Sequence, residues 1–115
     1  MRLSAALLTA TFLTSPVLGA DAPSYRLEIG DEGFAPATLA IPAGTRVELL
    51  VTNSRSLPSE FESFDLNREK VVPSGATVTV WIGPLPAGKY KFFDDFNPGI
   101  TGWILAAELS AGPQP

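Results

Sequence analysis

Asp94 and Asp95 form an acidic pair with aromatic residues on both sides, in a stretch that reads Phe-Phe-Asp-Asp-Phe-Asn-Pro. The sequence predicts that this pair lies in a loop where the chain leaves one strand, turns at Pro98-Gly99 and enters another strand. Adjacent carboxylates beside apolar side chains suit a hard cation, because a bound cation compensates charge that is costly in such surroundings. The alternative is an ordinary polar turn, where aspartate is common.

Glu60 and Glu62 form a second acidic pair, separated by Phe61. In an extended chain residues two apart share a face, so both carboxylates can reach one cation while Phe61 points to the other side. The alternative is an acidic face exposed to solvent. The expected metal ligands are therefore Glu60, Glu62, Asp94 and Asp95.

Weaker candidates lie further along, where Asp65 and Glu69 are interspersed with the basic residues Arg68 and Lys70. Surface ion pairs are the default interpretation of such a segment, and they contribute little to stability. A second interpretation has Arg68 holding one of the site carboxylates in place from behind.

The residue inventory excludes several kinds of site. The sequence has no cysteine and no histidine, and its only methionine is Met1. A Ser-His-Asp triad, a cysteine nucleophile and the usual zinc sites are therefore excluded, no catalytic residue is predicted, and any metal must be held by oxygen. The formal net charge of −4 and the lack of a basic cluster exclude nucleic-acid binding and favour cations or basic partner surfaces.

The first twenty residues are predicted to be a secretory signal peptide. Met1-Arg2 supplies a positive start, residues 3–18 are mostly apolar, and the small residues Gly19 and Ala20 follow. The apolar stretch is shorter than the ~20 residues of a typical membrane span, although an uncleaved anchor is an alternative. We expect a periplasmic protein with one domain, residues 21–115, and no membrane insertion after the signal is removed.

The rest of the chain reads as short strands between turns rich in proline and glycine, with no helical period. About seven strands in an antiparallel two-sheet β-sandwich are expected. The segment 59–66 is expected to be irregular, because Phe61 and Phe64 fall on opposite faces of an extended chain. The clearer strands are predicted at residues 25–29, 38–41, 45–53, 76–82, 89–93 and 102–109.

Three stretches resemble the cupredoxins. Residues 34–45 resemble the F-x-P-x-x-I-x-V-x-x-G segment of that superfamily, residues 51–53 its strand that ends in asparagine, and residues 85–93 the strand that leads into its metal loop. The resemblance covers nearly all of the chain after the signal. It implies an all-β, cupredoxin-like Greek-key sandwich.

Within the superfamily, the chain is most similar to small periplasmic proteins of bacterial ferrous-iron uptake, the FtrB type and the cupredoxin domain of EfeO. Residues 58–63, 65–70 and 92–98 carry this likeness. It implies a protein that binds iron, with copper as an alternative, and assists iron oxidation or delivery. The implied partners are an iron permease of the inner membrane and a periplasmic iron-binding protein.

The chain departs from blue-copper proteins at every ligand position. Those proteins have cysteine where Asp94 stands, histidine where Asn97 stands, an axial methionine near Ile100 and a further histidine near Glu60. A type 1 copper site depends on a copper–thiolate bond, so that kind of site is excluded here. The fold can persist while its site is replaced.

Two other hypotheses remain open. The first is a metal-free sandwich that docks on a membrane or periplasmic partner through its acidic face together with Phe93 and Phe96. The second is a ferroxidase. A single site of oxygen ligands has no redox-active sulfur or copper centre to take up an electron, so an accessory role is expected rather than a stand-alone enzyme.

Overall fold

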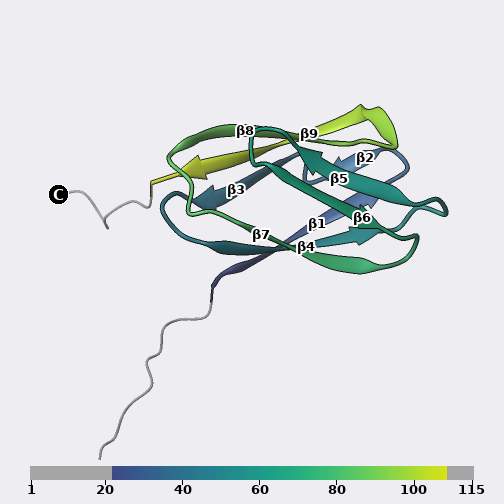
Figure 1. Ribbon diagram of the computed structural model, residues 1–115, viewed down its shortest axis with the longest axis horizontal. Coiled ribbons are helices and arrows are strands. Elements are labelled where there is room, and N and C mark those ends of the chain that lie inside the picture. Colours follow the sequence, from purple (N-terminus) through teal and green to yellow (C-terminus); the bar gives the residue numbers. More distant parts are fainter. Residues whose placement is uncertain (1–21, 109–115) are drawn as a thin grey trace, which may run out of the picture.

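The computed structural model describes residues 22–108, which form nine β-strands in two packed sheets (Figure 1). The four-stranded sheet has the order β2 (Gly33–Ala35), β1 (Ser24–Gly30), β4 (Val47–Asn53) and β7 (Thr77–Ile82). The five-stranded sheet has the order β3 (Thr38–Pro42), β9 (Asn97–Ala107), β8 (Gly88–Asp94), β5 (Ser59–Ser63) and β6 (Arg68–Val72). The predicted all-β sandwich is confirmed.

Two details of the sandwich differ from the prediction. The strands β1 and β4 pair in parallel, as do β3 and β9, whereas an antiparallel arrangement was expected throughout. Strands β2 and β6 were not predicted, because each is short and has no clear alternation. None of the described residues forms a helix that could cross a membrane, and the predicted signal peptide lies outside this part of the chain.

The core between the sheets is formed by the side chains that point inward from alternate positions of the strands. In β4 the side chains of Val47, Leu49 and Val51 are fully buried, while the residues between them are partly exposed. Phe61 on β5 and Phe92 on β8 are the largest fully buried side chains, and their ring centroids lie 5.2 Å apart. Fully burying an aromatic side chain contributes about 1.5–3 kcal/mol, so these two rings fix the inner faces of β5 and β8.

Strand β5 is regular, contrary to the irregular segment expected at 59–66. Its side chains alternate as the sequence requires, with Phe61 inside and Glu60 and Glu62 on the other face. Phe64 falls on the same side as the two glutamates and lies beyond the strand end, in the turn to β6. Phe61 and Phe64 fall on opposite faces because one ring points into the core and the other points outward, and no bulge is needed to explain this.

The connection between β8 and β9 is also tighter than predicted. The turn consists of Asp95 and Phe96, and Asp94 pairs with Asn97 across it. The Pro98-Gly99 pair does not make the turn but belongs to β9, in a bulge where residues 98–100 have no counterpart on β8. A proline removes one ladder hydrogen bond, which a bulge tolerates.

Candidate metal site

The hairpin that joins β8 to β9 places Asp94 and Asp95 on opposite sides of the five-stranded sheet. Asp94 pairs with the buried Phe61 and is itself fully buried between the sheets. Asp95 follows in the turn and is exposed. The Asp95 carboxylate groups with those of Glu60 and Glu62, whereas the Asp94 carboxylate faces Arg55, so the two do not converge on the same cation.

The outer face brings together Glu60, Glu62 and Asp95. One carboxylate oxygen from each of the three lies within 4.8 Å of the others, a spacing that suits a single bound cation. Glu60 is 8% exposed, Glu62 is half-buried and Asp95 is exposed. A backbone hydrogen bond of 2.9 Å from the Asp95 N–H to the Glu60 carbonyl ties the two segments together.

The outer carboxylates crowd one another. Glu69 on β6 lies directly opposite Glu62, and like charges in that position oppose each other. Burial, a hydrogen bond with the Asp95 carboxyl and the charges of Glu69, Glu62 and Asp95 raise the pKa of Glu60 to about 7. Burial and the charges of Glu69 and Asp95 also raise the pKa of Glu62. A cation would relieve this repulsion.

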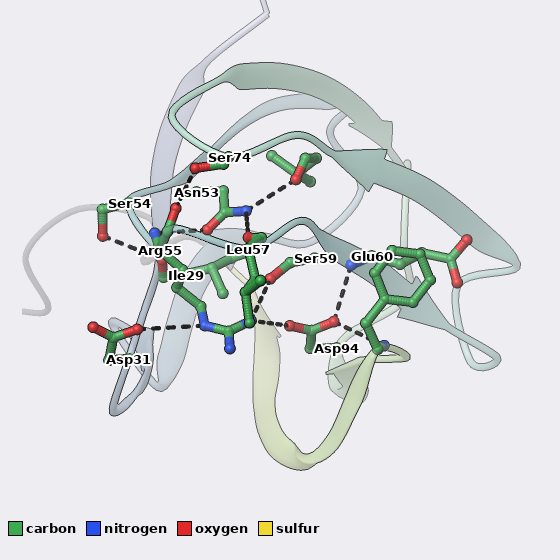
Figure 2. A network of polar contacts seen from close by, with 12 residues as sticks. Ile29, Asp31, Asn53, Ser54, Arg55, Leu57, Ser59, Glu60, Ser74 and Asp94 are labelled. Atoms are coloured by element: carbon green, nitrogen blue, oxygen red, sulfur yellow. Dashed lines mark hydrogen bonds and ion pairs between the residues drawn. The ribbon is translucent and has the colours of Figure 1, made fainter.

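Asp94 belongs to a different network, on the inner side of the sheet (Figure 2). Its Oδ1 accepts hydrogen bonds from the backbone N–H of Glu60 at 2.9 Å and of Phe96 at 3.0 Å. Its Oδ2 lies 3.6 Å from the Arg55 guanidinium. The carboxylate is therefore engaged by the chain itself, and Asp94 is removed from the predicted ligand set.

Arg55 is the cation that sequence reasoning missed. Figure 2 shows its guanidinium between Asp94 and Asp31, whose Oδ1 lies 3.6 Å from Nε. Arg55 also donates to the Ser59 hydroxyl at 3.1 Å, and its backbone N–H donates to the Asn53 side chain at 2.8 Å. Its side chain is only 13% exposed, although residues 54–58 look like an ordinary polar loop in the sequence.

Arg68 does not hold a site carboxylate, contrary to one interpretation of the sequence. Its Nε donates to the backbone carbonyl of Trp81 at 2.8 Å, and its Nη1 donates to the carbonyls of Leu66 and Asn67. The guanidinium thus ties the β5–β6 turn to β7. Among residues 22–108 no Lys or Arg lies within 4.0 Å of the Glu60, Glu62, Glu69 or Asp95 carboxylates.

Comparison with known proteins identifies the family. The sequence model of the cupredoxin-like domain matches residues 3–106. The chain belongs to the cupredoxin-like domain family. It is also 36% identical over 81 residues to the uncharacterized protein RP394 of Rickettsia prowazekii (strain Madrid E). That match covers 70% of this chain and 65% of the relative, so the chain spans less than two thirds of the relative's length.

Solved structures share the cupredoxin-like fold at low sequence identity. The purple cupredoxin from Nitrosopumilus maritimus has a TM-score of 0.56 and 22% identity, over 76% of this chain and all of that one. The periplasmic domain of cytochrome oxidase subunit II of Bradyrhizobium japonicum has a TM-score of 0.66 and 7% identity, over 80% and 88%. The metal-binding domain of the Cu(I)-exporting ATPase CopA of Streptococcus pneumoniae D39 has a TM-score of 0.63 and 17% identity, over 80% and 92%.

The donor atoms of this cupredoxin-like chain do not fit a type 1 copper centre. At the position where the resemblance places the copper cysteine, Asp94 pairs with Arg55, so a guanidinium supplies the positive charge there. The outer group of Glu60, Glu62 and Asp95 offers oxygen alone, which suits hard cations rather than copper(I). The side chains that could hold a metal therefore lie on the outer face of the five-stranded sheet, not at the Asp94 position.

Proposed function

We propose that this cupredoxin-like protein is a periplasmic accessory of iron uptake that binds iron, or another hard cation, through Glu60, Glu62 and Asp95. The observation that carries the proposal is the convergence of three carboxylates that have no Lys or Arg within 4.0 Å in the described part of the chain. Unpaired charges so close together are costly, and a divalent cation with oxygen ligands offsets that cost. Asp94, which the sequence also suggested as a ligand, has no part in this site.

The role we infer is delivery rather than catalysis. Two of the three ligands, Glu62 and Asp95, reach the surface of the sheet and would hold a cation where a second protein can reach it. An iron permease of the inner membrane or a periplasmic iron-binding protein would require such access. Carboxylate ligands cannot themselves accept an electron from Fe(II), so the acceptor must come from outside this group. We therefore propose that any iron oxidation needs a partner or added copper.

Calorimetric titration of residues 21–115 with Fe(II), Mn(II) and Cu(I) tests this function. We expect one hard cation per chain and at least about a tenfold loss of affinity in Glu62→Gln/Asp95→Asn, because two of the three ligands lose their charge. The matched control Glu28→Gln/Glu32→Gln removes the same charge from the other sheet and its turn, and should bind as the wild type does. No binding to the wild type, or equal losses in both variants, would refute the site.

Oxygen consumption with Fe(II) tests the accessory role separately. The wild type should oxidise Fe(II) no faster than Glu62→Gln/Asp95→Asn when copper is absent. Faster oxidation by the wild type alone would make this protein a ferroxidase in its own right.

A further inference from the structure

A second surface lies beside the carboxylates and is aromatic. Phe64, Phe93 and Trp103, which we call the aromatic surface, share the outer face of the five-stranded sheet with Glu62. Phe64 is 77% exposed, and its ring contacts that of Phe93 with centroids 5.2 Å apart. Exposed apolar surfaces of this kind next to polar residues mark places where proteins bind one another.

Phe64 is held in its exposed position by a well-anchored turn. The neighbouring Asp65 side chain accepts a hydrogen bond from the backbone N–H of Lys91 at 2.8 Å. Leu66 is buried, and its N–H donates to the Ser63 hydroxyl at 3.1 Å. A ring displayed by a fixed backbone loses little conformational freedom on binding, which is the property of an anchor for a partner.

Phe64 lines two hollows. The apolar hollow has a volume of about 180 Å³ and the polar hollow about 230 Å³. Both are smaller than the ~300–1,000 Å³ pockets that take up drug-sized ligands, so each suits a single side chain. The apolar hollow is lined by Phe64, Asp65, Lys91, Phe93 and Trp103. The polar hollow is lined by Glu62, Ser63, Phe64, Asn67, Arg68 and Glu69.

The charges of the polar hollow define what would enter it. Glu62 and Glu69 face each other across β5 and β6, and neither has a basic partner within 4.0 Å among residues 22–108. Arg68 lines the same hollow, but its guanidinium is engaged by backbone carbonyls. The hollow therefore attracts a cationic side chain from outside.

We propose that this face docks a segment of a partner protein that carries a large apolar side chain next to a lysine or arginine. The apolar side chain fills the hollow beside Trp103, and the basic side chain crosses Phe64 to meet Glu62 and Glu69. A second copy of this chain would set acidic groups against acidic groups, and an anionic lipid surface would be repelled for the same reason. The docking needs no bound cation, but it shares the Glu62 carboxylate with the proposed cation site.

Titration with synthetic peptides tests the proposal, in EDTA so that no metal contributes. Four peptides share a Gly-Ser frame and carry Phe or Ser at one position and Arg or Glu at the next. Binding is followed by amide chemical shifts and by Trp103 fluorescence in a Trp81→Phe background. The Phe-Arg peptide should bind at least about tenfold more tightly than the other three and shift Phe64, Phe93 and Glu69.

Variants separate the surface from a general effect of exposed apolar residues. Phe64→Ser should lose at least about tenfold in affinity for the Phe-Arg peptide, and Glu69→Gln should reduce only the preference for Arg over Glu. Leu57→Ser removes another exposed apolar side chain, 59% exposed on a different loop, and should bind normally. Equal binding of all four peptides, or equal behaviour of Phe64→Ser and Leu57→Ser, would overturn the proposal.

Either of two further results would overturn the proposal and assign a different occupant to this surface. Concentration-dependent dimerisation in sedimentation, abolished by Phe64→Ser, would make a second copy the occupant. Binding to vesicles of anionic lipid, abolished by the same substitution, would make it a membrane. We expect the wild type to stay monomeric and to leave such vesicles unbound.

Discussion

Asp94 and Asp95 are neighbours in the chain, yet they lie in opposite environments. The Asp94 carboxylate is fully buried, accepts two backbone hydrogen bonds and faces the guanidinium of Arg55. The Asp95 carboxylate is exposed and meets two other carboxylates, those of Glu60 and Glu62. On the inner side of the sheet the positive charge comes from Arg55, whereas on the outer side no Lys or Arg among residues 22–108 lies within 4.0 Å of the carboxylates.

The difference shows that one side of a sheet can carry a carboxylate whose counter-charge is part of the fold, while the other side carries carboxylates that can still bind a cation. A buried carboxylate needs its counter-charge in the folded chain, because water cannot supply one. A group of carboxylates that reaches solvent through Glu62 and Asp95 can remain without one until a cation or a basic partner arrives. The inner network therefore serves stability, and the outer group is free to serve binding.

The largest effect is expected from replacing each aspartate by alanine. Asp94→Ala should lower the free energy of unfolding by about 3–5 kcal/mol, for two reasons. The Arg55 guanidinium loses its buried counter-charge and keeps only the exposed Asp31 carboxylate and the Ser59 hydroxyl, and two backbone N–H groups lose their acceptor. Asp95→Ala should leave it within about 0.5 kcal/mol of the wild type. Urea unfolding followed by fluorescence measures both.

A double variant distinguishes a lost ion pair from general damage. Arg55→Met/Asp94→Asn removes both charges, so it should be less destabilised than the sum of the single changes. Similar stability of Asp94→Ala and Asp95→Ala would mean that the inner network contributes nothing, and the contrast between the two sides would be lost.

The next effect is the dependence of cation binding on pH. The pKa of Glu60 is raised to about 7, and a metal binds the deprotonated carboxylate. Affinity for Mn(II) should therefore rise about tenfold per pH unit up to about pH 7 and level off above it. Titrations at several pH values measure the slope. Glu60→Gln should bind more weakly and show a flatter profile, and an equal slope in that variant would contradict the assignment.

Glu60 should also make the stability of the protein depend on pH in the direction opposite to that of most carboxylates. Folded Glu60 takes up its proton at about pH 7, against an ordinary value of 4.5, so the folded state binds the proton more tightly than the unfolded state. Without a cation, its contribution to the free energy of unfolding should fall as pH rises through this window. Urea unfolding at several pH values should show this slope in the wild type and lose it in Glu60→Gln.

The smallest effect is expected from reversing one outer charge. Glu62→Lys turns the repulsive pair with Glu69 into an attractive one, so the melting temperature should rise by a few degrees at most. Salt should diminish the gain, because exposed charges are screened. A fall in melting temperature at low salt would show that the outer carboxylates do not repel one another.

Much of the fold could be predicted because its signals are local. The alternation in β4, with Val47, Leu49 and Val51 inward, specifies a strand and its buried face before any partner is known. Strands β2 and β6 were missed, since a three-residue strand and a charged edge strand carry no such pattern. The parallel pairing of β1 with β4 was missed because pairing joins distant segments.

The candidate site was predicted in its residue types and only partly in its members. Glu60, Glu62 and Asp95 are brought together as expected, but Asp94 is turned inward. That inversion depends on where the strand ends: with β8 continuing to Asp94, strand alternation assigns this residue to the core. The sequence suggested a long loop instead, in which no face is specified.

By itself, the sequence determined the all-β class, the inward face of the strong strands and the need for oxygen ligands, because alternation and residue chemistry act within a few residues. Only the tertiary structure decided that Arg55 would neutralise Asp94 and that Glu69 would face Glu62. Both depend on segments that are far apart in the chain and meet only when the strands pair. Whether a charge is paired depends on its neighbours in space, and the order of residues alone does not reveal those neighbours.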